Sequence, residues 1–247
     1  MSDLTLLNVA GPVARLALNR PDARNALSID LLDALLDTLT RIPSDVTVLV
    51  LTGEGKAFCA GMDLRAVLDD PDAPPRLLSR LGRFSLALRA LPCVVVGRIN
   101  GAAIGGGCGL ACVCDFAFTH ADSKMGFPEV DLGVCPAVVA PWVVRRVGPG
   151  PARRILLAGG LMSGRDAYSI GLATHLVDSL DLLDDAVDAL ASNLARGGPH
   201  ALRATKALLN ELDGSTDHAL IDRAADLSAR VIAGPEAQAR LRRTRGT

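Results

Sequence analysis

The stretch INGAAIGGGCGLACVCD, residues 99–115, most constrains what this chain can fold into, because it sets three consecutive glycines before a run of small apolar residues. Glycine loses more backbone freedom on folding than other residues do, so a triplet is costly unless the backbone itself is needed there. The apolar run CVVVGRI, residues 93–99, precedes it and is typical of a buried strand. The stretch therefore predicts a strand, a tight glycine turn and a helix that begins near Gly107.

Comparison with known glycine-rich loops narrows the kinds of ligand that this turn could bind. The triplet lacks the lysine and hydroxyl residue of a P-loop, and its spacing fits a dinucleotide fingerprint poorly. What remains is a set of free N–H groups at the positive end of a helix. A second glycine turn, AFCAGMDL at residues 57–64, follows a different predicted strand. The two turns could direct two amides at one oxygen, as in an oxyanion hole, or could simply permit tight packing.

Strands and helices alternate along the rest of the chain. Ser28 is a predicted N-cap for a helix that starts at residue 29, and a polar, proline-rich connection at residues 69–75 precedes a second helix. This order predicts an α/β core followed by a largely helical C-terminal part. The expected strands are a hairpin of residues 4–9 and 13–19, then 46–52, 93–99, 115–121 and 174–178, and the expected helices begin with 29–42 and 76–90.

Charge and hydropathy exclude several classes of function. The formal net charge of −1 argues against nucleic acid or a membrane surface as the main partner. No apolar run reaches the roughly 20 residues of a membrane-spanning helix, and the N-terminal residues do not have the pattern of a signal peptide. We therefore expect a cytoplasmic protein.

The six cysteines are expected to be reduced and to pack in the core. Cys108, Cys112, Cys114 and His120 lie close together in the sequence, but no second C-x-x-C pair completes a tetrahedral site. We therefore predict no metal.

Four segments carry a resemblance to a known family. NRPDARNALS (19–28), GKAFCAGMDL (55–64), NGAAIGGGCGLACVCD (100–115) and MGFPEVDLGVCP (125–136) resemble the signature segments of the crotonase, or enoyl-CoA hydratase/isomerase, superfamily, in the same order and spacing. The resemblance covers nearly the whole chain. It implies a crotonase-like spiral of ββα units at residues 1–190 that binds an acyl-CoA thioester, and a C-terminal helical trimerisation region at 191–247. It also implies a homotrimer or a hexamer, and no cofactor besides the coenzyme A of the substrate.

The resemblance also assigns roles to individual positions. It implies that the amides of Met62 and Gly106 form the oxyanion hole. Asp63 is expected to cap the helix that follows it and to hold its loop in shape. The resemblance also implies substrate contacts from Ala60 and the turn Asp22, Ala23 and Arg24 at the nucleotide end. It implies further substrate contacts from Asp63, Leu64, Gly105 and Gly109.

The chain departs from the family pattern at one catalytic position. Many hydratases of the family use two glutamates, one after the glycine triplet and one in the later PE segment. This chain has the second, Glu129, but Gly109 stands at the first position. A hydration mechanism that uses two glutamates is therefore not available to this chain, and Glu129 must act alone or with a substitute. Asp131 is the nearest candidate substitute, whereas Ala137 replaces the second acid of dienoyl isomerases.

Several functions stay open from the sequence. The first is an enoyl-CoA hydratase that uses Glu129 for both the water and the proton. The second is a Δ3-Δ2 enoyl-CoA isomerase, in which one carboxylate moves a proton, and a decarboxylase is a further variant. The third is a catalytically weak acyl-CoA-binding protein. For Cys108, Cys135 and Trp142 we favour core packing over ligand contact, and we expect Asp115 to anchor a strand.

Overall fold

The computed structural model describes residues 3–63, 68, 70 and 72–245 of the 247. Its largest element is a six-stranded sheet in the order β1-β2-β3-β5-β7-β10, in which only the β1–β2 hairpin is antiparallel. A four-stranded sheet has the order β4-β6-β8-β9. The strands of the large sheet are β1 (Thr5–Ala10), β2 (Val13–Leu18), β3 (Val48–Gly53), β5 (Val94–Ile99), β7 (Phe116–His120) and β10 (His175–Val177), and those of the small one are β4 (Ala57–Cys59), β6 (Ala102–Ile104), β8 (Lys124–Gly126) and β9 (Leu161–Ser163).

The chain winds between the two sheets in a regular way. β3, β5 and β7 lie in the large sheet, and the strand after each of them, β4, β6 and β8, lies in the small sheet. The expected spiral of ββα units is therefore present. The helices are α1 (Ile29–Thr40), α3 (Ala73–Ala90), α4 (Gly106–Val113), α5 (Ala140–Val147), α6 (Pro149–Ala158), α7 (Gly164–Ser169), α8 (Leu183–Ala195), α9 (Pro199–Leu212), α10 (His218–Ile232) and α11 (Pro235–Arg245), with 3₁₀ turns η1 (Pro21–Ala23), η2 (Val130–Leu132) and η3 (Leu180–Leu182).

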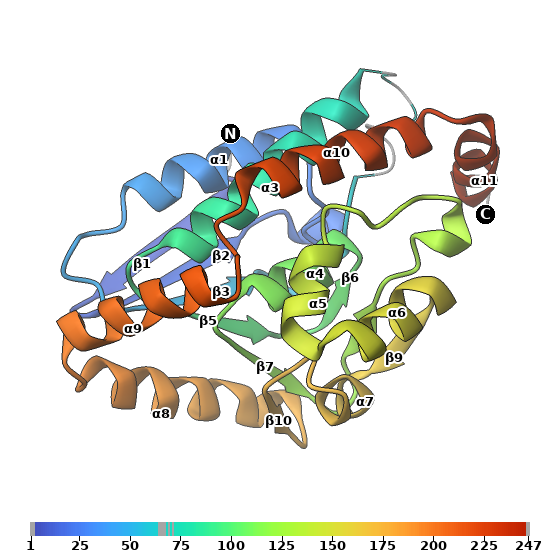
Figure 1. Cartoon of the computed structure of the whole chain (residues 1–247). Coiled ribbons are helices and arrows are strands. Elements are labelled where there is room, and N and C mark those ends of the chain that lie inside the picture. The colour runs from blue at the N-terminus through green and yellow to red at the C-terminus, as the bar shows by residue number, and fades with distance from the viewer. Residues whose placement is uncertain (1–2, 64–67, 69, 71, 246–247) are drawn as a thin grey trace.

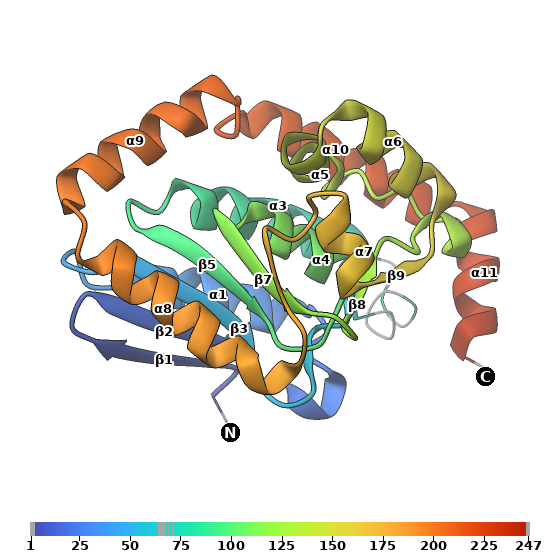
Figure 2. The same ribbon diagram turned by 90° about the horizontal axis from the view of Figure 1, so that it is seen from below.

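Helices cover both faces of the large sheet (Figures 1 and 2). Along β3, Leu49 and Leu51 belong to the main core, whereas Val48 and Val50 point to the other face and pack with Leu183 and Val187 of α8. This alternation follows from the two-residue period of a strand. It explains why the strand reads as a continuous apolar run, since both of its faces are buried.

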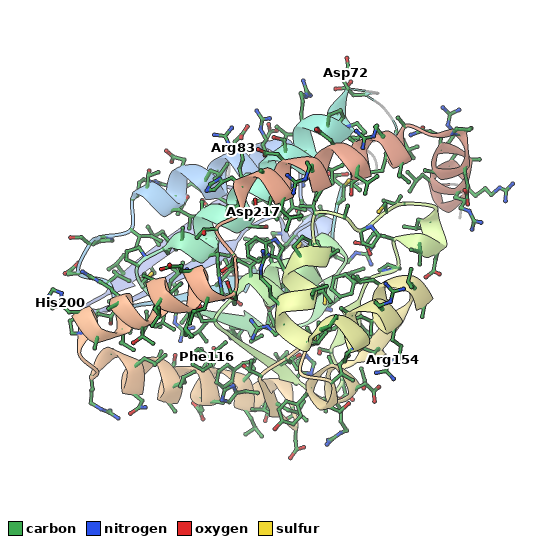
Figure 3. The ribbon with its side chains drawn as sticks, viewed as in Figure 1. Asp72, Arg83, Phe116, Arg154, His200 and Asp217 are labelled. Atoms are coloured by element: carbon green, nitrogen blue, oxygen red, sulfur yellow. The ribbon has the colours of Figure 1, made fainter. Side chains whose placement is uncertain are left out.

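The C-terminal helices share the main core. α10 packs along α3, and a Cβ added at Gly82 of α3 would lie 2.6 Å from a methyl carbon of Ile221 of α10. Figure 3 shows Asp72, before α3, and Asp217, before α10, at opposite ends of this helix pair, which is therefore antiparallel. Farther along, Ile232 and Leu241 are also buried in the main core. The division of the chain near residue 190 stays a prediction.

Most expected elements are present, and the differences have local causes. The hairpin, the Ser28 cap and the long strands are confirmed. The second helix begins at Ala73 rather than 76, because Pro74 and Pro75 occupy first-turn positions where a missing N–H is harmless. The expected set of strands was incomplete, since it omitted all four strands of the small sheet, β4, β6, β8 and β9. Such three-residue strands are too short to show a periodic pattern.

Within the described part of the chain, no helix is both long enough and apolar enough to cross a bilayer.

Candidate active site

A cavity of about 90 Å³ lies where the two glycine turns meet α3, α10 and the segment before α5. It brings together Met62, Gly105, Gly106 and Glu129, four of the residues inferred from the sequence. Its described lining consists of Ala60, Gly61, Met62, Leu77, Leu78, Leu81, Ile104, Gly105, Gly106, Pro128, Glu129, Leu132, Val134, Cys135, Pro136, Val138, Val139 and Ser228.

The two glycine turns pack directly on each other. Gly61 has φ +89°, which favours glycine, and a Cβ there would lie 2.7 Å from the carbonyl oxygen of Ile104 and 3.8 Å from the nitrogen of Gly106. Leu27 lies beside both turns, because its Cδ1 is 3.0 Å from the Cβ position of Gly106. Any side chain at Gly61 would therefore separate the turns.

The backbone of Leu27 orients the amide of Met62. Leu27 donates to the carbonyl of Gly61 (2.7 Å) and accepts from the N–H of Asp63 (2.9 Å), which makes a parallel bridge to Met62. In such a bridge the central residue directs its own N–H and C=O away from the partner strand. The N–H of Met62 has no acceptor in the described part of the chain.

The amide of Gly106 is free because it opens a helix. Gly105 has φ +54° and ψ −118°, and its carbonyl accepts the first helical bond, from Gly109 (2.8 Å). The N–H groups of the first helical turn have no partner within the helix and lie at its positive end. Among the described residues, none accepts from the N–H of Gly106. Two unpaired backbone donors therefore border one cavity.

Glu129 lies against the first of these turns. A Cβ at Gly105 would come within 2.8 Å of Glu129 Oε1, so glycine is required there for space as well as for conformation. The backbone of Glu129 is fixed, since its carbonyl accepts from Leu132 (3.0 Å) and Val134 (2.8 Å). Its Oε2 is buried and has no hydrogen-bond partner among the described residues. Burial raises the pKa of this carboxyl from 4.5 to about 7, and the nearby Asp131 carboxylate adds to the rise.

Val139 fills the space next to Gly109. A Cβ at position 109 would lie 2.9 Å from Val139 Cβ and closer still to its Cγ1. Val139 is buried and lines the cavity, at the residue before α5. Among the described lining residues, this valine therefore stands where a side chain at position 109 would point. No described residue places a substitute carboxyl there.

The residues expected at the nucleotide end lie together, with Asp22 and Arg24 exposed and Ala23 and Ala60 half-buried. Asp22 and Ala23 lie in η1, and Arg24 follows with φ +52°. The carbonyl of Arg24 accepts from the N–H of Ala60 (3.0 Å), which fixes this turn beside the second glycine turn. Asn25, which the sequence did not single out, fixes this turn through hydrogen bonds from the protein interior.

Asn25 is fully buried and has φ +56°. Its Oδ1 accepts from the N–H of Arg20 (2.8 Å), and its Nδ2 donates to the carbonyls of Glu54 and Ala57. The asparagine thus joins the η1 turn to the segment that leads into the second glycine turn. The residue type was the available sequence signal, because Asn adopts a left-handed backbone conformation more readily than most residues do.

Asp63 holds its loop through an ion pair. Its carboxylate is 3.2 Å from Nη2 of Arg20, whose Nη1 donates to the carbonyl of Ala26. The helix that Asp63 was expected to cap and the predicted contact Leu64 lie outside the described residues.

The other ionisable candidates have structural partners. Asp131 accepts from the N–H of Gly160 (2.9 Å), so it fixes the loop before β9 and does not face Glu129 across the cavity. Asp115 accepts from the N–H of Val95 (2.8 Å) and pairs with Arg89 and Lys206, which confirms its anchoring role.

Cys108, Cys112 and Trp142 are buried in the main core, as expected. The expectation of core packing was wrong for Cys135, which is only partly buried and lines the cavity, because its segment runs along the cavity wall before α5. No group of three potential metal ligands occurs within the described ranges. Burial raises the pKa of the Cys108 thiol well above its usual range, as expected of a packing residue.

Much of the cavity wall had no signal in the sequence. Leu77, Leu78 and Leu81 show only that one face of α3 is apolar. Ser228 comes from α10, more than 90 residues after the segment that it holds. Its Oγ donates to the carbonyl of Cys135 (2.6 Å) and accepts from the N–H of Ala137 (3.2 Å).

Comparisons with known proteins agree with this geometry. The family model described as enoyl-CoA hydratase/isomerase matches residues 9–240. The chain is similar to the crotonyl-CoA hydratase of Syntrophomonas wolfei, 36% identical over 88% of this chain and 84% of that protein. It is also similar to the 2,3-dehydroadipyl-CoA hydratase of Escherichia coli, 34% identical over 81% and 78% of the two chains. The solved structure of a Mycobacterium smegmatis enoyl-CoA hydratase superposes with a TM-score of 0.80, at 30% identity over 90% of each chain. The chain therefore belongs to the enoyl-CoA hydratase/isomerase family.

Proposed function

We propose that the protein is an enoyl-CoA hydratase that adds water to a 2-enoyl-CoA thioester and yields the 3-hydroxyacyl-CoA, with Glu129 as its single acid–base residue. The observation that carries the proposal is the buried Glu129 carboxyl beside two unpaired backbone amides in one cavity. The named hydratases among its relatives support the same reaction.

The amides of Met62 and Gly106 are proposed to bind the thioester oxygen. When water attacks C3, the electrons of the C2=C3 bond move toward the thioester and place negative charge on that oxygen. A preorganised amide donor at such an oxygen contributes about 3 kcal/mol to the stability of the transition state. Neutral peptide groups supply this stabilisation without a cofactor, and that of Gly106 also lies at the positive end of α4. Coenzyme A is needed only as the carrier of the substrate.

Glu129 is proposed to carry the proton through the reaction. Its carboxylate takes a proton from the attacking water, and the resulting carboxyl returns that proton to C2 of the enolate. A pKa of about 7 suits both halves of this cycle, since the group gives and takes a proton with similar ease near neutrality. A single residue thus accepts the proton and returns it. This is required because glycine, and not a second glutamate, stands at position 109.

A Δ3-Δ2 enoyl-CoA isomerase is the second candidate. The filling of the position-109 space by Val139 favours it, because isomerisation moves a proton between C2 and C4 and needs no bound water. The same carboxylate and the same two amides would serve both reactions.

We propose a homotrimer or a dimer of trimers in the cytoplasm, with the nucleotide of coenzyme A along Asp22, Ala23, Arg24 and Ala60. α9 supports an oligomer, because it exposes three large apolar side chains, Leu208, Leu209 and Leu212. Sedimentation velocity would measure the assembly, and a monomer at micromolar concentration would contradict it.

The decisive test is the activity of Glu129→Gln. Hydration removes the conjugated-enoyl absorbance of crotonyl-CoA, whereas isomerisation of a 3-enoyl-CoA creates it. We expect the parent protein to hydrate crotonyl-CoA and the variant to lose about 100- to 10,000-fold in kcat. Asp131→Asn is the matched control, because its carboxyl lies two residues away but binds the N–H of Gly160. Full activity of Glu129→Gln would remove Glu129 from its role, and acyl-CoA binding without either reaction would favour a binding protein.

A further inference from the structure

The wall of the cavity beside α4 is apolar among the described residues. Val139 occupies the space beside Gly109, and its neighbour Val138 also lines the cavity. Val139 is 4% exposed and Val138 is 2% exposed, so neither side chain turns toward solvent. A substrate bound to the two amides would meet hydrocarbon on this side.

The charge of the cavity lining restricts the charge that the acyl group can carry. Among the described residues that line the cavity, Glu129 carries the only carboxyl and none carries a cation. A terminal carboxylate on the acyl chain would have no partner there and would approach the carboxyl of Glu129. Burial of an unpaired charge is strongly unfavourable. The site therefore suits an uncharged acyl group.

The size of the cavity limits the length of the acyl group. The cavity measures about 90 Å³, whereas a cavity that holds one benzene ring is roughly 150 Å³. Leu77, Leu78 and Leu81 of α3 close one side of it, and Val134, Val138 and Val139 close another. These described side chains are held in a packed interior, so shortening one of them enlarges the space on its side of the cavity.

We propose that the site is specific for short, uncharged enoyl-CoA thioesters of about four carbons, and that Val139 sets the limit on chain length. This inference rests on the proposed enoyl-CoA chemistry and adds a substrate class and a specificity-determining residue to it. Val139 thus stands where a side chain at position 109 would point. Its role there is steric, because it bounds the acyl group and does not position water.

The test is a comparison of kcat/KM for trans-2-enoyl-CoA thioesters of four, six and ten carbons and for an enoyl-CoA that ends in a carboxylate. For the parent protein we expect kcat/KM to fall at least about tenfold from four to ten carbons and about 100-fold for the carboxylated substrate. Val139→Ala is expected to shift the six-to-four carbon ratio about tenfold toward the longer chain.

Val143→Ala is the matched control. Val143 is a fully buried valine one turn farther along α5 and is not among the described lining residues, so its truncation makes a similar cavity elsewhere. We expect it to leave the ratio within about twofold of the parent value. Equal shifts in the two variants, or a parent protein that prefers ten carbons or the carboxylated substrate, would overturn the inference. The proposed function fails separately, if no enoyl-CoA in the series is converted.

Discussion

Glu129→Gln is expected to make the protein more stable while it removes the activity. Burial raises the pKa of Glu129 from 4.5 to about 7, and a tenfold change in proton affinity is about 1.4 kcal/mol, so the charged form destabilises the fold by about 3 kcal/mol. The folded pKa is the higher one, so this loss is absent below about pH 4.5 and complete above about pH 7. An uncharged isostere avoids it.

The measurement is urea denaturation of both proteins at one protein concentration, followed by fluorescence. Trp142 is the only tryptophan and is buried, so its emission reports unfolding of the core beside α4. We expect the variant to be more stable by about 3 kcal/mol near pH 8 and by less than about 1 kcal/mol near pH 5. Glu211→Gln, an exposed glutamate of α9, should show no such dependence. A stability difference that does not change with pH would refute the reasoning.

Two further predictions concern the acid–base group and the missing one. The kcat/KM for crotonyl-CoA should rise with pH and level off above about 7, because the carboxylate of Glu129 is the form that accepts the first proton, and a rate that falls over this range would contradict that role. Gly109→Glu should lower the free energy of unfolding by about 1–3 kcal/mol without raising the hydration rate, since the new side chain would collide with Val139. Adding Val139→Gly to that variant should restore part of the lost stability, and a faster, equally stable single variant would show that the space is free.

The local structure followed from local sequence. The continuous apolar runs predicted the central strands because both of their faces are buried, and Ser28 predicted a helix start because its hydroxyl accepts from the N–H of Leu31. The glycine triplet predicted a helix opening, and α4 begins at Gly106, one residue before the expected position. The order and spacing of four segments identified the family, which the comparisons confirm.

The tertiary structure decided what these segments form together. Glu129 is adjacent to Gly105 only because β6 and β8 pair in the small sheet, and three-residue strands carry no periodic signal. The sequence showed that a carboxyl is missing at Gly109, but only packing brings Val139 into that space, thirty positions later in the chain. Likewise, Ser228 reaches the cavity because α10 lies along α3. Spacing along a chain encodes turns and faces, whereas contacts between distant segments depend on how those faces pack, and that packing determines the pKa of the catalytic candidate and the size of its pocket.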